Sequence, residues 1–362
     1  MKLKKLFAGI LAVAMMATMA APAFATRPTT SYSLGDQKIA VSDDGTFTIK
    51  KEYNANTGAT APDETFNLTA TKVSAKNTSI KDFMDDGKYE LTITGAKYEN
   101  STITGFNVKL PNYGKPGEFV YKLNEVDNGV AGVAYDANDY YLTVYALQKA
   151  DVDKTASGND LQYAVRLSRG LAALNDKTSD NYKVDTINNS YTAEPLSISK
   201  IVNGNMGDRT QPFDFEVVFT SDKSVKSTIT VSGTHGEITG VGVTLNNNNE
   251  FTFDKEATLK FTLTHGQTIN FTNLPEGVSY TVKEVNVPEG YKTYINDADT
   301  TATATEGRIA NDAVTISYEN VNGDTTIDTG VILDNAPYIA LMMVVVAGAA
   351  VMIIKKRRHF ED

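Results

Sequence analysis

Short runs in which apolar and polar residues alternate recur along the whole middle of the chain, and clusters of Gly, Asn, Asp and Pro separate them. A period of two is typical of strands that bury one face, whereas helical periodicity is weak here. Over this length, the turn spacing predicts an elongated all-β protein with two tandem immunoglobulin-like antiparallel β-sandwich domains, residues 26–192 and 193–322. The clearest runs are TFTIK from Thr46, FVYKL from Phe119, YYLTVYAL from Tyr140, FDFEVVF from Phe213, LKFTLT from Leu259 and VTISYE from Val314.

Both ends of the chain have the pattern of targeting segments. Residues 1–25 combine a basic start, an apolar stretch and the small-residue sequence APAFA, so a signal peptide cut after Ala25 is predicted. Residues 337–354 form an uncharged, mostly apolar run of about 27 Å as a helix, followed by four basic residues. We therefore expect a transmembrane sorting helix and a basic cytoplasmic tail within 331–362.

The central part of the chain is acidic and contains no cysteine. Seven of the 34 Lys and Arg residues and three of the 44 Asp and Glu residues lie outside 26–329, so the middle has a net charge of −14. This charge argues against nucleic acid or anionic lipid as partners. The absence of Cys excludes disulfides and thiolate metal sites, and the three histidines are scattered. We expect no cofactor, no metal and no enzyme activity with turnover.

Each half of the chain places three polar residues where the alternation calls for hydrophobic ones. A lysine ends the apolar face of the first strand, a glutamate follows Tyr and an aliphatic residue at spacing two, and an asparagine lies near the end of the half. One such residue alone is usually a side chain at the rim of a domain or half of an ion pair. The repetition of all three in the same order argues against that reading. The residues are Lys51, Glu125 and Asn189 in the first half, with Asn188 as the alternative asparagine, and Lys200, Glu284 and Asn320 in the second.

This combination permits one covalent reaction if the three side chains meet away from water. Burial favours the neutral, nucleophilic amine and the protonated carboxyl group. The amine can then attack the carboxamide with loss of ammonia, while the acid bonds the carbonyl oxygen and moves protons to the leaving nitrogen. The reaction occurs once per molecule on its own chain, so it is self-processing.

The segments that carry these residues resemble a known family. The first set is FTIKKEYN, KPGEFVYKLNE and INNS, and the second is LSISKIVNGNMGDRTQPFDF, TNLPEGVSYTVKE and ISYEN. Together with GVILDNAPYIAL near the end, they resemble the backbone pilins of the streptococcal T-antigen type over essentially the whole chain. The resemblance implies a pilus shaft subunit with two internal isopeptide bonds, Lys51 to Asn189 beside Glu125 and Lys200 to Asn320 beside Glu284.

The same resemblance places a sortase sorting signal in residues 323–330. TIDTG keeps the Thr329 and Gly330 of such signals, although Asp328 stands where related pilins have Pro, and cleavage is expected after Thr329. In this family the Thr carbonyl passes to a lysine of the next subunit; Lys183 is the first candidate and Lys177 the second. The implied partners are a sortase, identical subunits in a covalent head-to-tail polymer, peptidoglycan or a basal pilin, and a host receptor. The alternative is a wall-anchored adhesin that does not polymerise.

Overall fold

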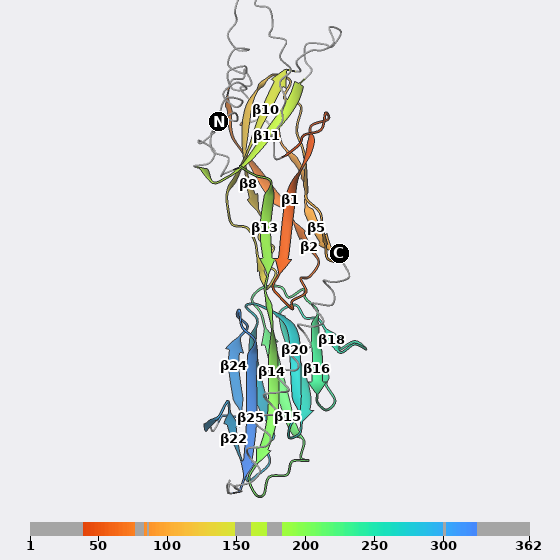
Figure 1. Ribbon diagram of the computed structural model, residues 1–362, viewed down its shortest axis with the longest axis vertical. Helices are drawn as coiled ribbons and strands as arrows, with labels where there is room; N and C mark the ends of the chain where they lie inside the picture. The colour runs from red at the N-terminus through yellow and green to blue at the C-terminus, as the bar shows by residue number, and fades with distance from the viewer. Residues whose placement is uncertain are drawn as a thin grey trace, which may run out of the picture.

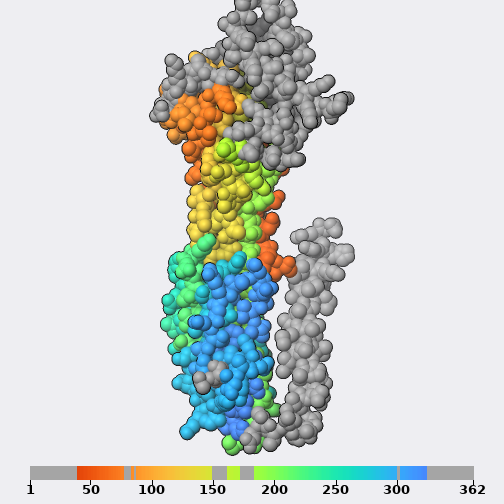
Figure 2. Space-filling model, turned by 90° about the vertical axis from the view of Figure 1, so that its left-hand side faces the viewer, coloured from red at the N-terminus to blue at the C-terminus, as the bar shows by residue number. Residues whose placement is uncertain are grey.

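The computed structural model describes residues 39–76, 83–84, 87–148, 161–171, 183–299 and 302–323. Two β domains are stacked end to end in an elongated molecule, with β13 of the first leading directly into β14 of the second (Figure 1). Figure 2 shows the described parts of the two domains in contact at the waist of the molecule. The prediction of an all-β fold is confirmed for the described part of the chain.

The first domain encloses its core between two five-stranded sheets, and a three-stranded sheet flanks them within the described residues. The first sheet has the order β4 (Thr92–Thr94), β7 (Phe106–Lys109), β1 (Thr46–Ala55), β13 (Thr186–Tyr191) and β9 (Val133–Ala134). The second has the order β12 (Lys183–Val184), β11 (Leu161–Arg169), β10 (Tyr140–Gln148), β8 (Gly117–Glu125) and β3 (Leu68–Lys76). The small sheet is β2 (Glu64–Phe66), β5 (Ala96–Glu99) and β6 (Thr102–Ile103).

The second domain repeats the two-layer arrangement with a seven-stranded and a five-stranded sheet in its described part. The larger sheet has the order β18 (Glu250–Phe251), β16 (Ile229–Thr234), β20 (Thr268–Pro275), β14 (Ala193–Asn203), β25 (Val314–Asn322), β22 (Tyr291–Ile295) and β23 (Ala298–Asp299). The smaller has the order β17 (Thr239–Val241), β19 (Glu256–Leu263), β15 (Phe213–Thr220), β21 (Ser279–Val285) and β24 (Ala304–Arg308).

The alternation in the sequence decides which side chains enter each core. In β1, Phe47 and Ile49 are buried, Thr48 between them is exposed, and Lys51 continues the same inward face. In β14, Ile198 is buried in the same way and is followed by an inward Lys200. Because successive side chains of a strand point to opposite faces, the phase set by the hydrophobic residues takes each lysine inward.

The prediction of antiparallel sheets is wrong at one strand pair in the described part of each domain. The first strand, β1, pairs with the last strand, β13, in parallel, and β14 pairs with β25 in the same way. Parallel neighbours need a long connection between them, and here the rest of the domain provides it. As a result the chain enters each domain at one pole and leaves it at the other, with the two strands side by side in Figure 1.

The junction between the domains contains both backbone and side-chain contacts. Ala131 N–H donates to the Ser224 carbonyl at 2.8 Å, and Ser224 N–H donates to the Gly129 carbonyl at 2.9 Å. Ala131 also packs into the core of the second domain. The buried Glu64 carboxylate accepts from Lys226 Nζ across the junction at 2.9 Å. These contacts connect the loop of Gly129 and Ala131, and the strand β2 that carries Glu64, to the second domain.

Thr192 alone separates β13 from β14. Its N–H donates to the Gly132 carbonyl, and its carbonyl accepts from Glu276 N–H, each at 2.9 Å. One bond goes to each domain, so the connecting peptide is held on both sides.

Several predicted segments lie outside the described residues: the signal peptide of 1–25, most of the sorting region, and the transmembrane helix with its basic tail. In the described ranges, no helix has the length and apolar character needed to cross a bilayer.

Candidate functional site

Three polar side chains meet inside the second domain. Lys200 and Asn320 come from the neighbouring strands β14 and β25, and Glu284 comes from β21 in the opposite sheet. Lys200 Nζ lies 2.8 Å from Glu284 Oε1, and neither side chain is exposed to solvent at all. Asn320 Nδ2 donates to the same oxygen at 2.8 Å. Lys, Glu and Asn therefore share one dry site.

The first domain has the same arrangement. Lys51 Nζ lies 2.7 Å from Glu125 Oε1, with both side chains fully buried, and Asn189 Nδ2 donates to that oxygen at 3.0 Å. Of the two neighbouring asparagines, Asn189 is buried in this site and Asn188 is exposed. The structure thus brings together the three residues singled out in the sequence of this half.

The two sites share one strand register. Asn189 pairs with Tyr53, and Asn320 pairs with Val202, so each asparagine lies opposite the residue two positions after the lysine. Two residues along a strand return to the same face, which is why Lys and Asn both point into the core from adjacent strands.

Burial changes the electrostatics of both lysines. Desolvation lowers the pKa of Lys51, against the opposing effect of Glu125, and lowers the pKa of Lys200 to about 8. Aromatic rings complete the apolar walls: Lys200 Nζ lies 4.2 Å from the centre of the Phe213 ring, and Lys51 Nζ lies 4.7 Å from that of Phe66. A lower pKa makes the neutral, nucleophilic amine easier to reach near neutral pH.

In both sites the glutamate contacts the Lys and Asn side-chain nitrogens, which are the attacking and leaving atoms if the amine displaces the amide nitrogen. One oxygen, Glu125 Oε1, is in contact with Lys51 Nζ and Asn189 Nδ2, and Glu284 Oε1 does the same in the second domain. This differs from the expectation that the acid bonds the Asn carbonyl oxygen. The carboxyl group is placed to carry a proton from the attacking nitrogen to the leaving nitrogen.

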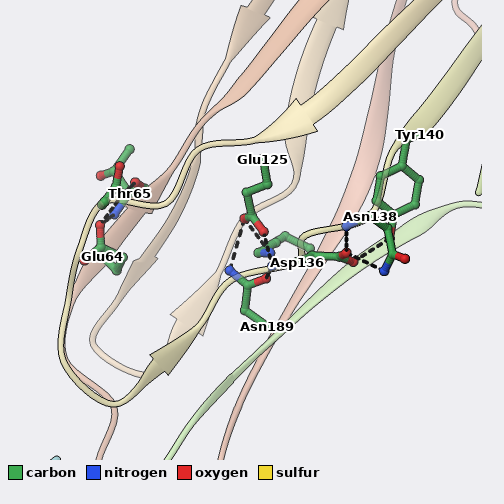
Figure 3. Close-up of polar contacts among 9 residues, drawn as sticks. Glu64, Thr65, Glu125, Asp136, Asn138, Tyr140 and Asn189 are labelled. Carbon is green, nitrogen blue, oxygen red and sulfur yellow. Dashed lines mark hydrogen bonds and ion pairs between the residues drawn. The ribbon is translucent and has the colours of Figure 1, made fainter. Parts of the chain in front are cut away.

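The first site contains a further group that the sequence analysis missed. Asp136 N–H donates to Glu125 Oε2 and to Asn189 Oδ1, each at 3.0 Å, so it reaches the carbonyl oxygen that the glutamate does not (Figure 3). The signal in the sequence is Asp-Ala-Asn before a strand, a common turn signature that by itself does not indicate a site.

The other predicted residues have different placements. Lys183 lies in β12 at an edge of its sheet and is half-buried. Lys177, Thr329 and Gly330 lie outside the described residues. Among the residues that the structure does describe, no group of three or more His, Asp or Glu side chains is arranged to hold a metal ion.

Comparisons with known proteins agree with the resemblance seen in the sequence. A family model described as a domain of unknown function, DUF7601, matches residues 194–322. A curated protein named pilin from Streptococcus pyogenes serotype M1 is 29% identical over 274 residues, which is 70% of this chain and 73% of that protein. The resemblance to a streptococcal pilin is thus confirmed.

Two solved structures are also similar to this chain. The crystal structure of the major pilin from Streptococcus pyogenes has 22% identity and a TM-score of 0.48, covering 77% of this chain and 99% of that one. The major pilin T3.2 from Streptococcus pyogenes serotype GAS13637 has 18% identity and a TM-score of 0.47, covering 78% and 99%.

Proposed function

We propose that this chain is a structural shaft subunit of a surface pilus, closed internally by two Lys–Asn isopeptide bonds and joined covalently to its neighbours. The observation that carries the proposal is the meeting of Lys, Glu and Asn in both cores at the same strand register. The similarity to a pilin along most of the chain supports the same conclusion.

The proposed reaction is the same in both domains. After proton transfer to the glutamate, the neutral Lys amine attacks the Asn Cγ, and a C–N bond forms there as the bond from Cγ to Nδ2 breaks. The nitrogen of the attacking amine gives up one proton and the leaving nitrogen gains one, so neutral ammonia departs. The carboxyl group mediates the transfer, and the atoms balance without another reactant.

The bonds would suit a fibre that bears tension. Each would join the first and last strands of a domain, which are parallel neighbours. Force that enters along one strand would pass through the amide to the other, so the hydrogen bonds between strands would not have to resist it. The cross-linked domain would therefore resist stretching.

Assembly would use the end of the chain. A sortase would cut between Thr329 and Gly330 and pass the Thr329 carbonyl to a lysine of the next subunit, Lys183 or Lys177. The last transfer would attach the polymer to peptidoglycan or to a basal pilin. The signal peptide and the sorting helix would bring the chain to the cell surface and hold it in the membrane until cleavage.

Boiling the cell-wall fraction in detergent and blotting for this chain tests the proposal. A ladder of multimers is the expected result, because covalent links survive the treatment. A single species would instead indicate the wall-anchored adhesin. Intact mass of the purified chain tests the internal bonds separately, with a deficit of two ammonia molecules expected.

A further inference from the structure

The turn between β9 and β10 lies against the candidate site of the first domain. Its Asp136 N–H points between Glu125 Oε2 and Asn189 Oδ1, at 3.0 Å from each (Figure 3). This N–H is the donor that the structure places on the carbonyl oxygen of Asn189. A charge would develop on that oxygen if the Asn189 carboxamide were attacked.

Side chains within the turn hold the donor in place. The Asp136 carboxylate accepts from the Asn138 backbone N–H at 2.9 Å and from Asn138 Nδ2 at 2.7 Å. Its other oxygen accepts from the hydroxyl of the buried Tyr140 at 2.5 Å. Burial would raise the pKa of the Asp136 carboxyl, but these hydrogen bonds hold it below its ordinary value, so the group remains an acceptor.

The second domain lacks an equivalent donor in its described part. Asn320 Oδ1 is buried and has no hydrogen-bond partner among the described residues. Thr293 Oγ1 lies 3.4 Å from Glu284 Oε2 and contacts the glutamate, not the asparagine oxygen. The two sites therefore share the Lys, Glu and Asn residues but differ in what surrounds the carbonyl oxygen.

We propose that the Asp136 backbone N–H stabilises the tetrahedral oxyanion that forms on Asn189 Oδ1 when Lys51 attacks, and that the Asp136 side chain and Tyr140 are positioning residues for this donor. The inference rests on the proposed self-cross-linking. During the step the Lys51 Nζ to Asn189 Cγ bond forms, and the electron pair of the C=O bond moves onto Oδ1. When that pair returns, Cγ–Nδ2 breaks and ammonia leaves. A hydrogen-bond donor already fixed beside the developing charge lowers the activation barrier, because no group has to reorient during the reaction.

The test follows bond formation in time. Full-length chains are recovered in denaturant from inclusion bodies, and the intact mass at time zero must show no lost ammonia, because bonds formed earlier would survive denaturation. The chains are then refolded in detergent-containing buffer and quenched at intervals. Intact mass counts the lost ammonia molecules, and peptide mapping assigns each one to a domain. Asp136→Pro removes the N–H itself. Asp136→Ala and Tyr140→Phe keep the N–H and remove what holds it, and Asp136→Asn retains an acceptor. The matched control is Tyr121→Phe, which removes a buried hydroxyl of the same domain that bonds Tyr89 and Tyr113 instead.

Removal of an oxyanion donor typically slows a reaction by about 10²-fold or more, so Asp136→Pro should slow the first bond by that order. Asp136→Ala and Tyr140→Phe should slow it by about tenfold, because a misplaced donor loses part of its effect. Asp136→Asn and Tyr121→Phe should retain the wild-type rate. The second bond serves as an internal standard and should be unchanged in every variant.

A folded Asp136→Pro variant that forms the first bond at the wild-type rate would overturn the inference. If Asp136→Pro does not fold, the test rests on Tyr140→Phe. The inference would be overturned if Tyr140→Phe formed the first bond as fast as Tyr121→Phe. Failure of the proposed function has a different signature, because the wild-type chain itself would then lose no ammonia.

Discussion

Asn189 lies opposite Tyr53 in the parallel pair of β1 and β13, two residues past Lys51. The second domain repeats this offset with Asn320 opposite Val202. The shared register gives each lysine one asparagine on the same face of the neighbouring strand. Asn188, one position earlier, points to the opposite face and is exposed.

This placement predicts different outcomes for two adjacent substitutions. Asn189→Ala should show a deficit of one ammonia molecule relative to the mass calculated from its own sequence, where the wild type shows two, because the first domain loses the carboxamide that would react. Asn188→Ala, the matched control, should keep the wild-type deficit of two ammonia molecules relative to the mass calculated from its own sequence. Intact-mass measurement of both variants checks the prediction, and the reverse pattern would assign the bond to Asn188.

Glu284→Ala should likewise prevent the second bond while leaving the first intact. The carboxylate is the group that contacts both the amine and the amide nitrogen, so its loss removes the proton path. Glu216→Ala is a suitable control, since Glu216 lies on the neighbouring strand and pairs with Lys260 near the surface at 3.2 Å. If mass and peptide fragmentation find a complete Lys200–Asn320 bond in Glu284→Ala, the glutamate has no part in the reaction.

Asn320→Ala should lower the stability of the chain to denaturant. A cross-link from residue 200 to residue 320 encloses nearly the whole second domain, and by the loop-closure estimate used for disulfides its loss costs about 5 kcal/mol. Guanidinium unfolding with a probe in the second domain measures the change. Asn247→Ala, in an exposed turn, should be neutral. Equal stability of the two variants would contradict a covalent closure.

In Asn320→Ala, Lys200 has no carboxamide to react with and remains a free amine. The pH dependence of the stability of this variant therefore reports the protonation of Lys200. Burial lowers the pKa of Lys200 to about 8 from its ordinary 10.5, so between these values the unfolded chain binds more protons than the folded one. The free energy of unfolding must then rise with pH across this window, by up to ~3 kcal/mol. Below pH 8 the full cost of burying the charged lysine remains. The double variant Asn320→Ala with Lys200→Met lacks the titrating group. Unfolding measured at pH 8 and pH 10 should show the rise in the single variant relative to the double one; parallel curves would mean that Lys200 is not desolvated.

Substitution of the linking lysine should abolish the multimer ladder without affecting the internal bonds. Lys183→Arg is expected to have this effect, since arginine keeps the charge but offers sortase no primary amine. Lys177→Arg is the control for this variant and also tests the second candidate. The single substitution that abolishes the ladder identifies the linking lysine. A ladder that persists in a variant carrying both Lys183→Arg and Lys177→Arg would exclude both lysines as the linking residue.

The sequence was sufficient to place six polar residues on inward faces. A strand has a side-chain period of two, so the neighbouring hydrophobic residues set the phase for Lys51 and Lys200 regardless of the rest of the fold. The same logic favoured Asn189 over Asn188, and in the structure Asn189 is buried and Asn188 is exposed. Strand direction was not accessible, because alternation looks the same whichever way a neighbouring strand runs, and the parallel pairs were therefore missed.

The Asp136 turn and the domain junction could not be predicted for a related reason. The contact with the site is made by the Asp136 backbone N–H, which every residue except proline has, so the sequence does not mark this position as part of the site. Glu64 and Lys226 are 162 positions apart, and nothing in their local patterns links them. Such contacts depend on how whole domains pack.

Thr192 is the entire connection between β13 and β14, and its peptide groups are bonded to Gly132 on one side and Glu276 on the other. The rotation of one domain relative to the other is therefore set by a few backbone dihedral angles that are already fixed. When such units are joined in series, the angle inside each one is repeated at every step. A fibre of these chains would thus take part of its handedness and pitch from the setting of one threonine.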